Sequence, residues 1–313
     1  MTTGTTASFA EYARQRRAEI DQALARVLPE AGDRLQTIHD AMRYSLTAGG
    51  KRFRPILTLA AAEAVGRDPA QARRLAMPAG CAIELIHTYS LIHDDLPAMD
   101  NDTLRRGKPT LHVVHGEGLA ILAGDGLLAE AFALLAREPD DAGQPEIAAR
   151  KLAAIRRIAE AAGSLGMVGG QAIDLQAAGH AHDAQALDAE ALRDMHARKT
   201  GALIRASAVV GAVMAGGSTS QIAAVDDYAA AMGLAFQIID DVLDVVGAGD
   251  ALGKTVGKDA AAGKPTYPAL YGLEASTRLA RDAADAALAA LALEQLHGSR
   301  LADIVEWVVS RRS

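Results

Sequence analysis

The sequence is poor in cysteine and in aromatic residues. Cys81 is the one cysteine among 313 residues, so no internal disulfide can form and a reducing compartment is expected. A lone thiol of this kind usually behaves as a small buried hydrophobe. Aromatic residues make up only 4% of the chain, which disfavours a sheet rich in aromatic and β-branched side chains.

Basic blocks and long apolar runs are also lacking. The net charge is −7, and no lysine- or arginine-rich run is long enough to follow a nucleic-acid backbone. Residues 1–21 contain arginines but no apolar core, which argues against a signal peptide. The longest apolar stretch, around residues 206–216, is shorter than the roughly 20 residues of a membrane-spanning helix. We therefore expect a cytoplasmic protein with no nucleic-acid partner and no membrane anchor.

Hydrophobic residues make up 50% of the chain, with alanine recurring throughout, and helical periodicity runs from end to end. We find no alternating run bounded by hairpin turns, and hence no sequence evidence for a sheet. Although the length alone favours about two domains, no segment resembles a linker. We predict a single all-α domain over 1–313, a large helical bundle around a deep central cavity. Helices are expected over 12–28, 35–46, 55–65, 76–96, 118–136, 146–163, 166–177, 188–215, 219–246, 267–293 and 301–311.

Two of these helices carry adjacent aspartates inside apolar runs. In the later one, Asp240, Asp241 and Asp244 form DDxxD, and positions i and i+4 share a helix face. Carboxylates gathered in this way repel one another unless cations neutralise them. Magnesium prefers oxygen ligands and often joins carboxylates to a substrate phosphate, although pairing with nearby lysines is an equally ordinary explanation.

The earlier motif is longer. Asp94, Asp95 and Asp100 form DDxxxxD, and six residues of straight helix would turn Asp100 away from Asp94. Pro97 disfavours α geometry at the preceding residue. A chain break there would let Asp100 approach the same ion as Asp94.

A di-iron site is the competing metal chemistry. Glu84 and His87 form one ExxH unit, but di-iron bundles use two such units and two further glutamates. The second unit is missing, so we reject this interpretation.

Basic residues accompany both aspartate motifs. Residues 49–55 place Lys51, Arg52 and Arg54 on a glycine-containing turn before a helix, and 104–109 add Arg105 and Arg106. Helix N-termini and guanidinium groups suit phosphate oxygens. Residues 253–255 read GKT, but the spacing and context of a P-loop are absent, so we do not predict a nucleotide site.

Several motifs together resemble the trans-isoprenyl diphosphate synthases. They are GGKRFRP (49–55), ELIHTYSLIHDDLPAMDNDTLRRGKPT (84–110), ILAGDGLL (121–128), GGQAIDL (169–175), ARKTGALI (197–204), FQIIDDVLDVVG (236–247) and GKPTYPAL (263–270). The resemblance implies a helical bundle around a deep cavity and a homodimer. It also implies head-to-tail condensation of isopentenyl diphosphate with dimethylallyl or geranyl diphosphate through an allylic cation, with about three magnesium ions per site as cofactor.

The same resemblance implies roles for individual residues. The metal ligands would be Asp94, Asp100 and Asp240, with Asp95, Asp241 and Asp244 binding directly or through water. The allylic diphosphate would contact Arg105, Lys199 and Lys254. Isopentenyl diphosphate would contact Lys51, Arg54, His87 and Arg106. Thr200 and Gln237 would lie beside the allylic carbon, and Lys264 would make a further phosphate contact.

Product length in the similar enzymes depends on the residue five positions before the first aspartates. Here it is Tyr89, followed by Ser90, which implies a fifteen-carbon product, farnesyl diphosphate. Helical spacing puts Tyr89 about 140° from Asp94, so a packed core tyrosine stays open, as do C20 and C10 products.

Two other classes share parts of this pattern. A terpene cyclase would contain DDxxD but would not need GGKRFRP, and a silent partner subunit would not need both aspartate motifs. The roles of Arg311, Arg312 and the first 48 residues are left open.

Overall fold

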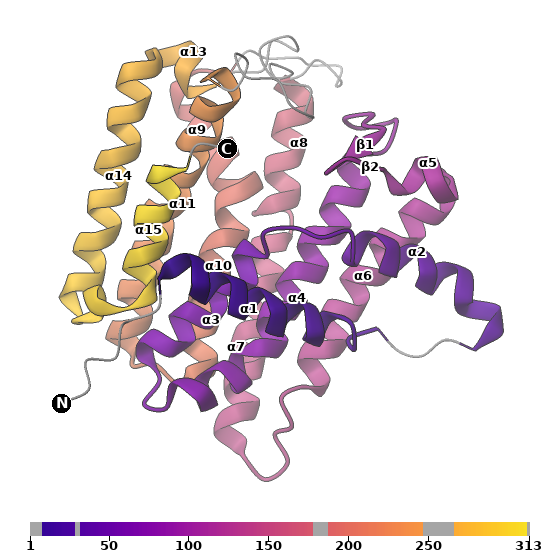
Figure 1. The fold of residues 1–313 in the computed structure, drawn as a ribbon, viewed down its shortest axis with the longest axis horizontal. Helices are drawn as coiled ribbons and strands as arrows, with labels where there is room; N and C mark the ends of the chain where they lie inside the picture. The colour runs from indigo at the N-terminus through magenta and orange to yellow at the C-terminus, as the bar shows by residue number, and fades with distance from the viewer. Residues whose placement is uncertain (1–7, 29–31, 178–186, 247–265, 312–313) are drawn as a thin grey trace.

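The computed structural model describes residues 8–28, 32–177, 187–246 and 266–311, and the structural statements below concern these residues (Figure 1). Most of them are helical. The helices are α1 (Phe9–Leu24), α2 (Gln36–Leu46), α3 (Phe53–Val65), α4 (Pro69–Asp94), α5 (Leu111–His115), α6 (Glu117–Arg137), α7 (Pro145–Ala162), α8 (Met167–Ala177), α9 (Ala189–His196), α10 (Ala202–Ala215), α11 (Thr219–Val246), α13 (Tyr267–Tyr271), α14 (Leu273–Leu293) and α15 (Arg300–Ser310), with short helical turns at Asp33–Leu35 and Leu296–Gly298.

The helix that carries the first aspartates starts earlier than predicted. The Asp68 side chain accepts hydrogen bonds from the backbone N–H groups of Ala70 and Gln71, and Pro69 occupies the first helical position. This is a strong N-terminal signal. The helix continues through Pro78, so α4 is 26 residues long and ends at Asp94.

The predicted helix 188–215 contains an irregularity. A π-helical turn, Ala197–Gly201, joins α9 to α10, and it contains two of the residues singled out above, Lys199 and Thr200. The predicted helix 267–293 is likewise divided, because Gly272 adopts φ 80° between α13 and α14.

The expectation of no sheet is wrong at one short hairpin. β1 (Leu104–Arg105) and β2 (Lys108–Pro109) pair antiparallel, with Arg105 opposite Lys108. Two-residue strands are too short to show an alternating pattern in the sequence. The hairpin follows the first aspartate motif and holds Arg105 in place.

Alanine explains how closely the central helices approach. Ala60, Ala61 and Ala62 of α3 are fully buried. Opposite them in α10, a Cβ added to Gly211 would lie 2.1 Å from the backbone oxygen of Thr58, so the two backbones nearly touch. One hydrophobic cluster extends from α1 to α15, and a smaller one joins α9, α11, α13 and α14.

Two of the described helices, α4 and α6, are long and apolar enough to cross a membrane by length and composition, which the search for uninterrupted apolar runs missed. In α4, 72% of the most apolar window is buried in the bundle, so it is a core helix. In α6 only 39% of the most apolar window is buried, and Ile121 and Leu122 are exposed. This leaves an apolar face that the chain itself does not cover.

Candidate active site

The first aspartate motif surrounds the C-terminus of α4. Asp95 is the residue at which the helix ends, and a turn containing Pro97 follows. The backbone N–H of Asp100 then donates to the backbone oxygen of Asp94, at 2.9 Å. The chain therefore folds back after the proline, and Asp100 returns to the end of the helix beside Asp94.

Asp94 and Asp95 have different surroundings. Burial raises the pKa of Asp94 to about 6; nearby Lys199 and Arg105 oppose the rise, whereas Asp100 and Asp95 add to it. Asp94 makes no ion pair within the described residues. Asp95 is buried and receives the guanidinium of Arg105 at 2.6 to 2.8 Å. Of these two adjacent aspartates, Asp94 is therefore the one without an ion-pair partner among the described residues.

The second motif lies near the C-terminal end of α11. Asp241 is buried; it accepts the Gln237 amide at 2.9 Å and the backbone N–H of Tyr267 at 3.0 Å, which ties α13 to α11. Asp240 is more exposed and pairs with Arg311 at 2.9 Å. Asp244 is half-buried and lies seven residues after Gln237, about 20° from it around the helix.

The π-turn brings a lysine and a threonine to the same end of the bundle. Lys199 forms an ion pair with Asp174 of α8. The turn packs directly on α8, because a Cβ added to Gly170 would lie 2.2 Å from the backbone nitrogen of Lys199. π-Turns occur often at functional sites, and this one places Lys199 within electrostatic range of Asp94. Thr200 is the next residue and is half-buried.

Of the cations in 49–55, Arg52 is fully used within the protein. Its guanidinium contacts Glu84 and Asp21, each at 2.8 Å, and the backbone oxygen of Leu46 at 2.7 Å. The prediction that it would join an anion pocket is therefore not supported, since its donors already have partners. The same ion pair gives Glu84 a structural role and removes it from any iron site.

Arg54 and its neighbours form a basic cluster that lacks carboxylate contacts. Arg54 makes no ion pair within the described residues, and its Nε is buried without a hydrogen-bond partner. Burial lowers its pKa, while Glu84 and Asp240 raise it. His87 has its pKa well below the ordinary value because it is buried, with Arg54 and Arg106 nearby, so the ring is neutral.

The hairpin arginines extend this cluster. The Arg106 guanidinium donates to the backbone oxygen of Gly49, and Gly50 has φ 146°, a backbone conformation that favours glycine. A narrow cavity of about 40 Å³ is lined by His87, Arg105 and Arg106, among other residues. Lys51 is exposed beside it. Lys254 and Lys264 lie outside the described residues.

Tyr89, the residue predicted to limit product length, lies near the C-terminus of α4. Tyr89 is 7% exposed and meets the His93 ring edge-on, with 5.7 Å between ring centroids. Burial and the nearby Asp94 raise its pKa, so the phenol is close to the aspartates in spite of the helical angle. The Ser90 hydroxyl donates back to the backbone oxygen of His87 at 2.9 Å.

Sequence reasoning missed three residues of this region. Asp174 holds Lys199, and Gln171 has a buried amide nitrogen without a partner; both lie in the GGQAIDL motif, which was the available signal. Arg311 pairs with Asp240, and no sequence pattern pointed to that contact.

A magnesium site fits these residues in its chemistry. Within the described part of the chain no three His, Cys, Asp or Glu side chains are already grouped around one metal position. Asp94 is nevertheless a partly desolvated carboxylate without a cation, with Asp100 beside it. Hard divalent ions that keep several waters and share ligands with phosphate suit such a site.

The fold and the site define a class of protein: a largely helical bundle (Figure 1) that carries two aspartate motifs near the ends of long helices and a basic cluster able to hold phosphates. The polyprenyl synthetase family model matches residues 35–297, and the chain belongs to this family. It is 44% identical to farnesyl diphosphate synthase of Geobacillus stearothermophilus over 97% of this chain and 98% of that protein. It is 49% identical to geranylgeranyl pyrophosphate synthase 7 of Arabidopsis thaliana over 83% of this chain and 71% of that protein.

A solved structure gives the same result. The FPP/GFPP synthase from Zymomonas mobilis, an apo structure, superposes with a TM-score of 0.82 at 36% identity, covering 96% of this chain and 99% of that one. The predicted isoprenoid-synthase fold is confirmed.

Proposed function

We propose that this protein is a prenyltransferase that condenses dimethylallyl and then geranyl diphosphate with isopentenyl diphosphate, head to tail, to give farnesyl diphosphate. The main support for the proposal is that two charged groups of opposite sign each lack an ion-pair partner in the described part of the chain. Asp94 is a desolvated carboxylate with no ion pair, and Arg54 is a guanidinium with no carboxylate contact, within the described residues. Diphosphates with divalent ions would complete both.

The roles follow from this arrangement. Magnesium, when bound to Asp94, Asp100 and Asp240, supplies charge neutralisation to a diphosphate leaving group. Lys199 and Arg105 hold the allylic diphosphate, and the C–O bond to it breaks as the diphosphate takes the electron pair. The oxygens of Thr200 and Gln237 stabilise the cationic carbon.

The second substrate occupies the basic cluster. Arg54, Arg106 and neutral His87 hold the diphosphate of isopentenyl diphosphate, with Lys51 at the rim. The double bond of this substrate forms the new C–C bond with the allylic carbon. A proton then leaves the neighbouring carbon, giving a new double bond, and the released diphosphate accepts it. Arg105 is held for its role by Asp95.

A fifteen-carbon product rests on Tyr89. Relatives named for C15 and for C20 synthesis have similar identities to this chain, so overall similarity does not separate the two products. Tyr89 is a large buried side chain close to Asp94, where it would stop a growing chain. A geranylgeranyl diphosphate synthase is the second candidate, favoured by the plant relative.

The exposed apolar face of α6 supports a homodimer. Ile121 and Leu122 are 44% and 58% exposed, with Val113 and Val114 of α5 continuing the surface. A second copy of the chain would bury this face. Sedimentation of the pure protein should give a dimer, which Leu122→Asp should shift toward monomer; a wild-type monomer would contradict the assignment.

Paired substitutions test the catalytic assignment. Asp94→Ala and Asp240→Ala should each lower turnover by about a hundredfold or more, since removing a charge-stabilising group costs that much in rate, with helical content by circular dichroism preserved. Asp285→Ala, on α14, is the matched control and should leave turnover unchanged. Rates near wild type in both aspartate variants would remove these residues from the metal site.

A further inference from the structure

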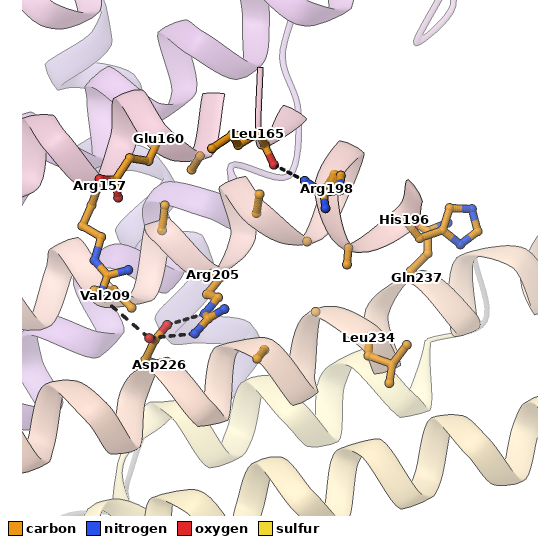
Figure 2. A pocket seen from close by; sticks show the side chains of 18 of the residues that line it. Arg157, Glu160, Leu165, His196, Arg198, Arg205, Val209, Asp226, Leu234 and Gln237 are labelled. Atoms are coloured by element: carbon orange, nitrogen blue, oxygen red, sulfur yellow. Dashed lines mark hydrogen bonds and ion pairs between the residues drawn. The ribbon is translucent and has the colours of Figure 1, made fainter. Parts of the chain in front are cut away.

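A second pocket lies on the outer side of the π-turn. It has a volume of about 470 Å³ and lies between α7, α9, the π-turn, α10 and α11 (Figure 2). That volume is within the usual range of small-molecule sites. Arg205 and Val209 of α10 line it, and so does Gln237 of α11, which we place at the prenyl-transfer site. We call this pocket the α10 groove.

The α10 groove has an apolar middle. Small or aliphatic side chains line it, including Leu165, Ala206, Val209, Ala230 and Leu234. Apolar walls of this kind favour a hydrocarbon body.

Charged groups lie at both ends of the groove. Figure 2 shows Arg157, Arg205 and Asp226 at one end and Arg198 at the other. Asp226 binds Arg205 closely and through two oxygens, which leaves Arg157 only a 3.9 Å contact with the same carboxylate. Four arginines and two carboxylates line the groove, and Arg198 is also paired with Asp194 outside it, at 2.8 Å. One positive charge is left over, and Arg157 has the weakest carboxylate contact of the three paired arginines. The excess positive charge selects an anion.

We propose that the α10 groove binds an amphiphilic anion, a linear hydrocarbon chain with one carboxylate or phosphate head, at a site that adjoins the prenyl-transfer site and shares Gln237 with it. The chain lies along the apolar middle, and Arg157 contacts the head, because Arg198 is already paired with Asp194 and with the backbone oxygen of Leu165. An occupant would also touch Arg198 and Gly201, the residues flanking Lys199 and Thr200. The proposal does not depend on which prenyl product the enzyme makes.

Calorimetric titration of the full-length protein with dodecanoate and with farnesyl monophosphate distinguishes the two head groups. Ala230→Phe fills the groove and should weaken binding at this site at least about tenfold. Ala223→Phe, an exposed position of the same helix outside the groove, is the matched control and should bind as wild type does. Because farnesyl monophosphate resembles a substrate, the expected result for that arm is the loss of one of two binding events.

A milder variant tests the site even if Ala230→Phe does not fold. Arg157→Gln changes a partly exposed side chain and should weaken binding about two- to fivefold, the range of an exposed ion pair. Dodecanol, which lacks the charge, should bind more weakly than dodecanoate. Binding of either anion that depends on Ala230 or Arg157 supports the site and identifies its head group. No binding by either anion, or binding that neither substitution changes, would overturn it.

Discussion

Arg311, near the C-terminus, provides the counter-charge of Asp240 in the second aspartate motif. Its Nη1 lies 2.9 Å from an Asp240 oxygen, and the guanidinium stacks 4.2 Å from the Phe236 centroid and 5.2 Å from that of Trp307. Arg311 therefore occupies the position of a cation beside a carboxylate that we assign to magnesium. Magnesium bound to Asp240, as proposed, would compete with this ion pair for the carboxylate.

Replacing Arg311 should strengthen magnesium binding. Arg311→Gln removes the internal competitor, so the magnesium concentration for half-saturation with pyrophosphate should fall about two- to fivefold, as for a partly exposed ion pair. Trp307 is the only tryptophan, and its fluorescence should respond to magnesium pyrophosphate in the wild type but much less in the variant. Arg278→Gln, on the surface of α14, is the control. An unchanged magnesium requirement and an unchanged fluorescence response in Arg311→Gln would show that no competition occurs.

Enlarging the site at Tyr89 should lengthen the product. Tyr89→Ala removes a buried ring close to Asp94 and should shift the main product from fifteen toward twenty carbons, as read by chromatography of the dephosphorylated alcohols. Tyr228→Phe, which alters another buried tyrosine that donates to the backbone oxygen of Leu301, should keep the wild-type product. If Tyr89→Ala still made only the C15 product, the gate would lie elsewhere.

Glu84 should prove structural. Its contact with Arg52 is 2.8 Å long, and both side chains are 4% exposed. Breaking a buried ion pair leaves an uncompensated charge, so Glu84→Gln should lower the free energy of unfolding by about 3 kcal/mol, measured by urea denaturation. Glu274→Gln, from an exposed pair, should change it by less than about 1 kcal/mol. Equal effects of the two substitutions would reject this role.

His196 should make the protein sensitive to acid. Burial lowers its pKa from 6.5 to about 4, with Asp174 opposing and Lys199 adding to the shift. Below pH 6.5 the unfolded chain therefore binds a proton at His196 that the folded chain does not bind. The contribution of neutral His196 to the free energy of unfolding is complete above that pH and is lost as the pH falls toward 4.

The expected loss attributable to His196 between pH 7.5 and pH 5 is about 1 to 2 kcal/mol. His196→Gln should abolish that part of the pH dependence in urea unfolding, whereas His297→Gln, at an exposed position, should leave it intact. Identical pH profiles for His196→Gln and the wild type would contradict the assignment.

Helical periodicity was sufficient to predict most elements, because each long helix buries one continuous apolar stripe. The details that shape the site depend on contacts distant in the sequence. The π-turn at Lys199 accompanies the close approach of α8 at Gly170, and apolar spacing does not reveal it. Arg52 and Arg54 look equivalent in the sequence, but only Arg52, with φ 51°, meets Glu84.

The contact between Arg311 and Asp240 joins positions 71 residues apart, and no local pattern encodes it. The family motifs pointed to the aspartates and to the basic cluster. They could not indicate which of those charged groups already have partners inside the protein.

The most direct test is to incubate the pure protein with dimethylallyl diphosphate, isopentenyl diphosphate and magnesium, and to determine the chain length of the products. We predict farnesyl diphosphate, with pyrophosphate released once per condensation and no product when magnesium is chelated. The absence of condensation, or release of a cyclic hydrocarbon from farnesyl diphosphate without isopentenyl diphosphate, would contradict the account.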